Sequence, residues 1–94
     1  MTKIKTKKIF QVGNSIQDNG YTLIKSDGFY KITFFILDPN NSNKVTINEI
    51  PISSGSTTET KIVTFKSDNI EPFDSDFSVY APNNSSVYVA MYYK

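Results

Sequence analysis

The chain contains no cysteine, no histidine, no tryptophan and no arginine. Without cysteine it has no disulfide framework, no thiolate zinc site and no thiol nucleophile. Without histidine it has no imidazole base and no ordinary catalytic zinc site. Without arginine, bidentate recognition of phosphate or carboxylate is impossible. Because these absences remove most catalytic chemistry, we expect a protein that is not an enzyme and that carries no cofactor.

Charge of either sign is also scarce. Lysine supplies all ten positive side chains, which nine acidic residues nearly balance, for a net charge of +1. A weak overall field without arginine argues against a dedicated nucleic-acid binder. The use of lysine alone, together with many isoleucines and asparagines, is typical of an AT-rich genome. Neither nucleic acid nor a small molecule is therefore expected as a partner.

Long apolar runs are missing as well. No segment approaches the roughly 20 apolar residues of a membrane helix. Residues 1–13 contain no apolar core of a secretory signal. We expect a chain made in the cytoplasm without a signal peptide and without membrane contact. Its 94 residues correspond to one domain, 1–94.

The sequence does contain alternation of apolar and polar residues. The clearest run is Phe29–Leu37, in which the even positions Tyr30, Ile32, Phe34 and Ile36 form one apolar face. Asn19-Gly20 and Asp27-Gly28 are turn signals before it. Further predicted strands lie in 3–12, 21–26, from Val45 past Pro51, in 61–66, around Phe77 and Val79, and in 87–93. Proline cannot donate to a ladder, so the strand that contains Pro51 is expected at a sheet edge.

These runs number about seven, with turn signals roughly every ten residues and no helical period. The pattern predicts an all-β protein, an antiparallel β-sandwich of short strands. An Ig-like sandwich and a short jelly roll both fit this length.

The lysine-rich start has two interpretations. Lys3, Lys5, Lys7 and Lys8 are exposed guards on an edge strand, or they form a basic arm that contacts a polyanion. Lys3, Lys5 and Lys7 alternate with Ile4 and Thr6, which suits a strand added to a sheet. We favour the edge strand for residues 1–8.

Two oxygen-rich segments were considered as cation sites. Residues 38–49 resemble an EF-hand calcium loop, with Asp38 first and Glu49 twelfth, but Asn43 stands where the sharp turn requires glycine. The second segment, the acidic connector 68–76, carries Asp68, Glu71, Asp74 and Asp76. A hairpin loop and a solvated connector are the favoured interpretations, so no metal site is predicted.

Aromatic residues give the best indication of function. If the even positions of Phe29–Leu37 face the core, Phe29 and Phe35 face outward; if the odd positions of 87–93 face the core, Tyr88 and Tyr92 face outward. On neighbouring strands these four side chains would share one outer face. Tyrosine and phenylalanine are enriched at protein interfaces. We therefore predict an interaction surface of Phe29, Phe35, Tyr88 and Tyr92, with cover of this face by the N-terminal arm or by a loop as the alternative.

Two segments carry a resemblance to known modules. Lys25–Phe34 and Asn84–Tyr93 are similar to strands of small jelly-roll modules, found in tumour-necrosis-factor-like trimers and in fibre, baseplate and decoration proteins of tailed phages. The resemblance covers about a quarter of the chain and carries over no functional residue. It implies a repeated structural or adhesive role, often in an oligomer.

The resulting functional hypothesis is a non-enzymatic structural or interaction module. Its most specific form is an accessory virion protein, a capsid decoration or fibre component, of a phage with an AT-rich genome. The partner would then be a second copy or a larger assembly such as a capsid. The alternatives are a carbohydrate-binding or adhesive sandwich, in one version calcium-dependent, and a small inhibitor or regulator of a host protein.

Overall fold

The computed structural model describes residues 3–10, 21–37, 45–52, 60–81 and 86–94. The strands are β1 (Lys3–Phe10), β2 (Tyr21–Ile24), β3 (Phe29–Leu37), β4 (Val45–Ile47), β5 (Ile50–Ile52), β6 (Lys61–Lys66), β7 (Phe77–Tyr80) and β8 (Ser86–Tyr93). A short 3₁₀ turn, η2 (Asp68–Ile70), connects β6 to β7. Within these ranges no helix is long and apolar enough to cross a membrane. The all-β prediction is confirmed.

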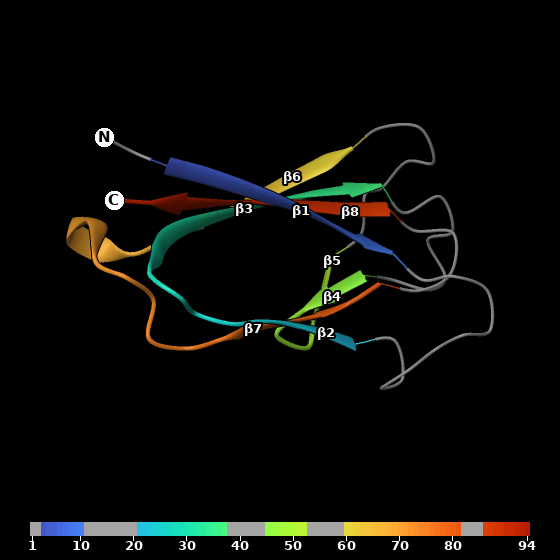
Figure 1. Ribbon diagram of the computed structural model, residues 1–94. Helices are drawn as coiled ribbons and strands as arrows, with labels where there is room; N and C mark the ends of the chain where they lie inside the picture. Colours follow the sequence, from blue (N-terminus) through green and yellow to red (C-terminus); the bar gives the residue numbers. More distant parts are fainter. Residues whose placement is uncertain (1–2, 11–20, 38–44, 53–59, 82–85) are drawn as a thin grey trace.

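The strands form two sheets of four that stack as layers (Figure 1). We call the β1-β8-β3-β6 sheet the first sheet and the β2-β7-β4-β5 sheet the second sheet. Pairing is antiparallel and nested, since β1 pairs with β8, β2 with β7, β3 with β6 and β4 with β5. A long hairpin rolled up in this way is a jelly roll of eight strands. Of the two predicted sandwiches, the strand order therefore selects the jelly roll over the Ig-like arrangement.

The eighth strand comes from a hairpin that the sequence did not predict. Residues 45–52 were expected to form one strand, but Asn48 and Glu49 adopt φ of 51° and 68° and turn the chain between β4 and β5. Two successive residues with positive φ are characteristic of a type I′ turn. The Asn48 N–H donates to the carbonyl of Ser78 at 2.7 Å, and its side-chain oxygen accepts from the Ser78 N–H at 2.9 Å. These bonds to β7 stabilise a turn that lacks glycine. Pro51 lies in β5 at the edge of the second sheet, as predicted.

The core lies between the two sheets. Its largest fully buried side chains come from β3, β4, β7 and β8: Phe29, Ile32, Phe34, Ile36, Val45, Ile47, Val79, Val87 and Val89. Ile32, Phe34 and Ile36 of β3 face the core as predicted, and so do Val87 and Val89 of β8. Because each strand contributes alternate residues to this layer, the opposite set of the first sheet faces away from it.

Phe29 is the exception to the alternation of β3. It was predicted to face outward, but it is fully buried, and its ring lies 5.7 Å from that of Phe73 and 6.0 Å from that of Phe77. The register against β8 shifts between Phe29 and Lys31: Phe29 pairs with Tyr93 and Lys31 with Tyr92, so that Tyr30 is the extra residue of β3. Such a bulge inserts one residue and reverses the parity of the residues before it. The prediction of Phe29 as an interface residue is therefore wrong.

Candidate interaction surface

The outer face of the first sheet carries a row of apolar side chains across three strands. In the register, Tyr88 of β8 lies opposite Phe35 of β3, and Phe35 lies opposite Ile62 of β6. Side chains that are directly opposite on one face of an antiparallel pair are close neighbours. We call Tyr88, Phe35 and Ile62 the outer apolar row.

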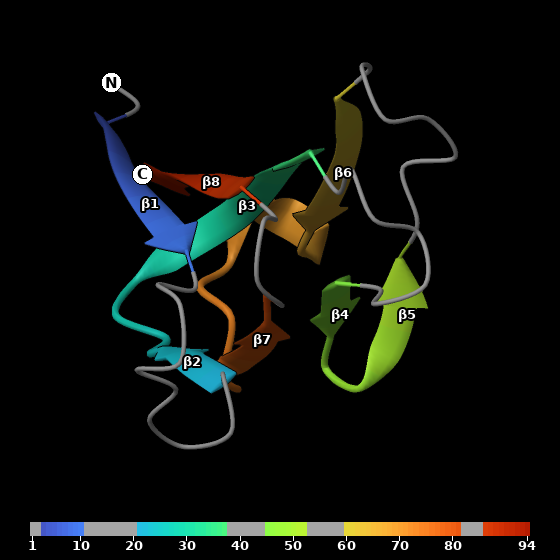
Figure 2. The same cartoon turned by 90° about the vertical axis from the view of Figure 1, so that its right-hand side faces the viewer.

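This row is largely open to solvent. Ile62 is 61% exposed and Tyr88 is 48% exposed, while Phe35 between them is half-buried. In the part of the chain that the structure describes, no element lies over the row (Figures 1 and 2). Cover of this face by the N-terminal strand is wrong, because β1 lies beside β8 in the plane of the sheet. Cover by a loop stays the alternative, since residues 38–44, 53–59 and 82–85 lie outside the described residues.

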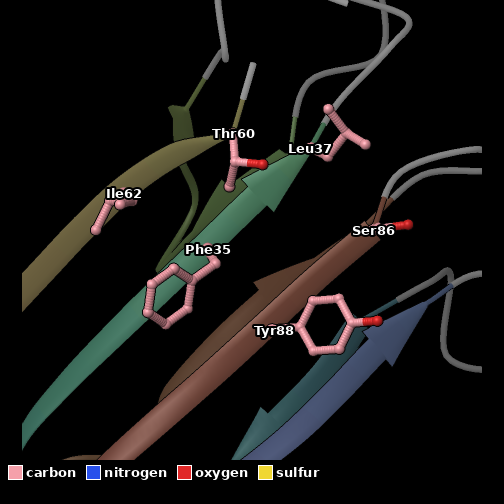
Figure 3. Close-up of a pocket in the computed structure, with 6 residues that line it drawn as sticks. All are labelled: Phe35, Leu37, Thr60, Ile62, Ser86 and Tyr88. Atoms are coloured by element: carbon pink, nitrogen blue, oxygen red, sulfur yellow. The ribbon is translucent and has the colours of Figure 1, made fainter. Parts of the chain in front are cut away.

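A hollow of about 630 Å³ opens along the outer apolar row (Figure 3). Six residues from β3, β6, β8 and the residue before β6 line it: Phe35, Leu37, Thr60, Ile62, Ser86 and Tyr88. Three of the six, Thr60, Ser86 and Tyr88, carry a hydroxyl group, and the other three are apolar. No Lys, Asp or Glu is among the lining residues. An apolar hollow with a few hydroxyl groups is suited to binding.

The neighbouring rows of the same face are less exposed. Thr33 and Ala90 are buried, and the hydroxyl of Thr33 lies 3.1 Å from that of Thr64 across β3 and β6. One row further along, the ammonium group of Lys31 lies 4.4 Å from the centre of the Tyr92 ring. A cation–π contact of this kind occupies one face of the ring. Tyr92 is therefore engaged by the protein itself.

Three of the four predicted aromatic residues share the outer face. Phe35 and Tyr88 are direct neighbours in the hollow, whereas Tyr92 lies on the same face outside it. Ile62 is the member of the outer apolar row that was not predicted from the sequence. Alternation in β6 already places Ile62 on the opposite face from Val63 and Phe65. What was missing was the pairing of β6 with β3, which no local pattern specifies.

The lysine-rich start forms the edge strand that we favoured. Among the described strands β1 pairs with β8 alone, and Lys3 and Lys5 are exposed. The ammonium group of Lys5 lies 4.7 Å from the centre of the Tyr93 ring. Lys7 and Lys8 pair opposite Val89 and Tyr88, and their side chains lie outside the described residues. Binding of a polyanion by this strand stays a prediction.

The acidic groups near the start of β3 serve the fold. Asp76 accepts hydrogen bonds from the Ser26 N–H at 2.8 Å and from the Ser26 hydroxyl at 3.1 Å. These two bonds, the backbone one above all, lower the pKa of Asp76. The Tyr93 hydroxyl donates to Asp27 at 2.7 Å; burial first and this carboxylate second raise the pKa of Tyr93 to about 12. Both contacts fasten the chain ahead of β3 to a neighbouring element.

Neither considered cation site gains support from the geometry. Residues 38–44 of the calcium-like loop lie outside the described residues, and 45–49 form β4 and the turn after it. Among described residues, no three carboxylates gather in a way that could hold a metal ion.

No protein-family model, curated protein or solved structure matches the chain. Its function therefore has to be argued from its own surface.

Proposed function

We propose that the protein is a non-enzymatic interaction module that binds a protein partner with the outer face of the first sheet. The observation that carries the proposal is the outer apolar row. Isolated exposed apolar residues are common on soluble proteins, but a contiguous set around a hollow is typical of a binding site. Tyrosine and phenylalanine, two of the three residues of the row, are enriched at protein interfaces.

An exposed isoleucine of the second sheet, Ile50, provides a control for Ile62. Ile50, in the edge strand β5, is as exposed as Ile62, at 61% for both residues. It does not line the hollow. The two isoleucines therefore form a matched pair in residue type and exposure that differ in their surroundings.

The proposed experiment uses this pair. A photo-crosslinking benzoylphenylalanine is introduced at position 62 in one variant and at position 50 in the other, and cells that make the full chain are irradiated. Because the partner would cover the hollow, we expect a discrete protein adduct from position 62 and little or none from position 50. Equal adducts from both positions, or none from position 62, would contradict the proposal.

The most specific form of the proposal is a component of a repeated assembly, such as a capsid decoration or fibre protein of a phage. The jelly roll supports it by analogy only, since viral capsid domains use this fold but other proteins do too. The lysine-only composition is consistent with an AT-rich genome. If the protein is such a virion component, we expect its gene to lie beside a capsid or portal gene and the protein to be recovered with purified particles. A gene in another neighbourhood together with particles that lack the protein would contradict the virion role.

A further inference from the structure

The net charge of +1 conceals a separation of charge. The strands of the first sheet contain four lysines in β1, one in β3 and two in β6, and no acidic residue. The strands of the second sheet contain no charged residue. The connector between β6 and β7 carries four carboxylates and no lysine: Asp68, Glu71, Asp74 and Asp76. Such a distribution gives the molecule a basic sheet and an acidic end in spite of its small total charge.

An apolar side chain projects from this acidic connector. Ile70 closes η2 and is 42% exposed, with Asp68 and Glu71 on either side of it in the sequence. Its φ is 58°, a left-handed conformation that a β-branched residue rarely adopts. Strained backbone of this kind is often found at sites of binding.

The connector is held firmly enough to keep that conformation. The Ser67 N–H donates to the carbonyl of Tyr30 at 2.9 Å, and the Phe73 N–H donates to the carbonyl of Phe29 at 3.0 Å. The Phe73 ring packs on Phe77 at 5.2 Å between centres. Both ends of the segment are thus fixed to the fold, and Ile70 lies between them.

The hollow has the complementary character. Its lining is mainly apolar, and two lysines lie on the same outer face of the first sheet: Lys31 of β3 pairs opposite Lys66 of β6, four residues along each strand from Phe35 and Ile62. The hollow lies where β3 ends and β8 begins, whereas η2 lies at the opposite end of the sandwich (Figures 1 and 3). An acidic segment with an apolar tip therefore lies at one end of the sandwich, and an apolar hollow lies at the other end, on the face that carries Lys31 and Lys66.

We propose that the occupant of the hollow is a second copy of this chain, which inserts Ile70 there and places the carboxylates of its connector against the lysines of the first sheet. This inference rests on the proposed function and names its partner. The contact joins two different surfaces, so a pair of copies still has one hollow and one connector unused. Such a head-to-tail contact repeats, and it closes into a ring or continues as a filament according to the rotation between copies.

The test uses one variant for each side of the contact. Ile62→Asp places a charge in the hollow and leaves the connector intact. Ile70→Gly removes the apolar tip, and it does not lower the Tm, because glycine adopts positive φ without strain. Ile50→Asp is the matched control for Ile62→Asp. Sedimentation velocity of the purified full chain is measured over a range of concentrations, at low salt and at about 0.5 M salt, where charge attraction is screened.

We expect the wild type and Ile50→Asp to assemble as concentration rises, with weaker assembly at high salt. Each single variant should associate at least about tenfold more weakly. In an equimolar mixture of the two variants, the Ile70 tip of Ile62→Asp can still enter the intact hollow of Ile70→Gly. The mixture should therefore form one-to-one dimers and nothing larger, because the other hollow and the other tip are altered. A mixture that stays monomeric, or Ile70→Gly that assembles like the wild type, would overturn the head-to-tail contact.

The photo-crosslink at position 62 separates the failure of this inference from the failure of the proposed function. A wild type that is monomeric at every concentration, with position 62 linked to a different protein, overturns self-assembly and leaves the interaction module standing. A monomeric wild type without any adduct at position 62 overturns both. A monomeric wild type that binds an oligothymidylate, and loses it in Lys31→Glu/Lys66→Glu, also overturns self-assembly and assigns this face to a polyanion.

Discussion

Phe34 and Phe35 are consecutive residues of β3 with opposite surroundings. Phe34 is fully buried, and its ring lies 5.9 Å from that of Phe65 and 6.0 Å from that of Phe77. Phe35 is half-buried on the outer face, opposite Tyr88 and Ile62. The inner face needs apolar residues to form a core, whereas the outer face of an antiparallel sheet can be polar. Apolar residues on the outer face therefore call for an explanation other than folding, and binding is the one we propose.

The largest effect is expected from replacing these two residues in turn. Phe34→Ala should lower the free energy of unfolding by about 3–5 kcal/mol, because it leaves a cavity among packed rings. Phe35→Ala should lower it by only about 1 kcal/mol, since the side chain is half-buried and its loss leaves no enclosed void. Urea denaturation of both variants measures the difference. Equal losses would mean that the outer face is a second core.

Because of the bulge, Phe29 is buried like Phe34 and does not lie on the outer face with Phe35. Phe29→Ala should cost about 3 kcal/mol, at the lower end of the range for buried phenylalanine, because the half-buried Phe73 and Tyr93 can partly close the space. The same denaturation experiment measures it. A loss as small as that of Phe35→Ala would place Phe29 on the surface, as the strict alternation of β3 predicted.

A smaller effect is expected in the buried part of the outer face. Thr33→Val preserves the shape of the side chain and removes its contact with the Thr64 hydroxyl. The loss should be about 0.5–1 kcal/mol, since the exposed Thr64 can bond to water instead. Thermal denaturation of Thr33→Val and of Thr64→Val should give similar values. A gain in stability in both variants would show that the two hydroxyls do not bond across the strands.

The smallest effect at neutral pH is expected from Tyr93→Phe, and its signature is alkaline. Because the pKa of Tyr93 is raised from 10.0 to about 12 in the folded protein, the folded state favours the protonated phenol. This contribution is complete below pH 10 and is lost as the pH rises toward 12. The wild type should therefore lose more stability than Tyr93→Phe over that interval, measured as Tm against pH. Parallel curves would contradict the role of the Asp27 contact.

Much of the fold could be predicted from local pattern. The even face of β3 and the odd face of β8 follow from alternation, because burial of one face fixes which residues point inward. Two local exceptions could not be predicted. The bulge before Lys31 depends on pairing with β8, and the turn at Asn48 depends on hydrogen bonds to Ser78, thirty residues away.

The candidate site was predictable in part for the same reason. Phe35 and Tyr88 each follow from alternation within one strand, but their contact follows from the strand order. Ile62 enters the surface only because β6 pairs with β3. The carboxylates near Ile70 were noted in the sequence as a solvated connector. Their proposed contact with Lys31 and Lys66 depends on the pairing of β3 with β6, which brings these two lysines together on the outer face.

The nested pairing also determines when the protein can fold. β8 lies between β1 and β3, so residues 3–10 have no sheet neighbour until residues 86–93 have been synthesised. Such distant pairings bring a large loss of chain entropy before any contact compensates it, which slows folding. During translation β4 and β5, which are consecutive in the sequence, can pair first. The edges of β1 and β3 stay unpaired until their partner strands have been synthesised. The lysines of β1 then protect the nascent chain from aggregation through that exposed strand.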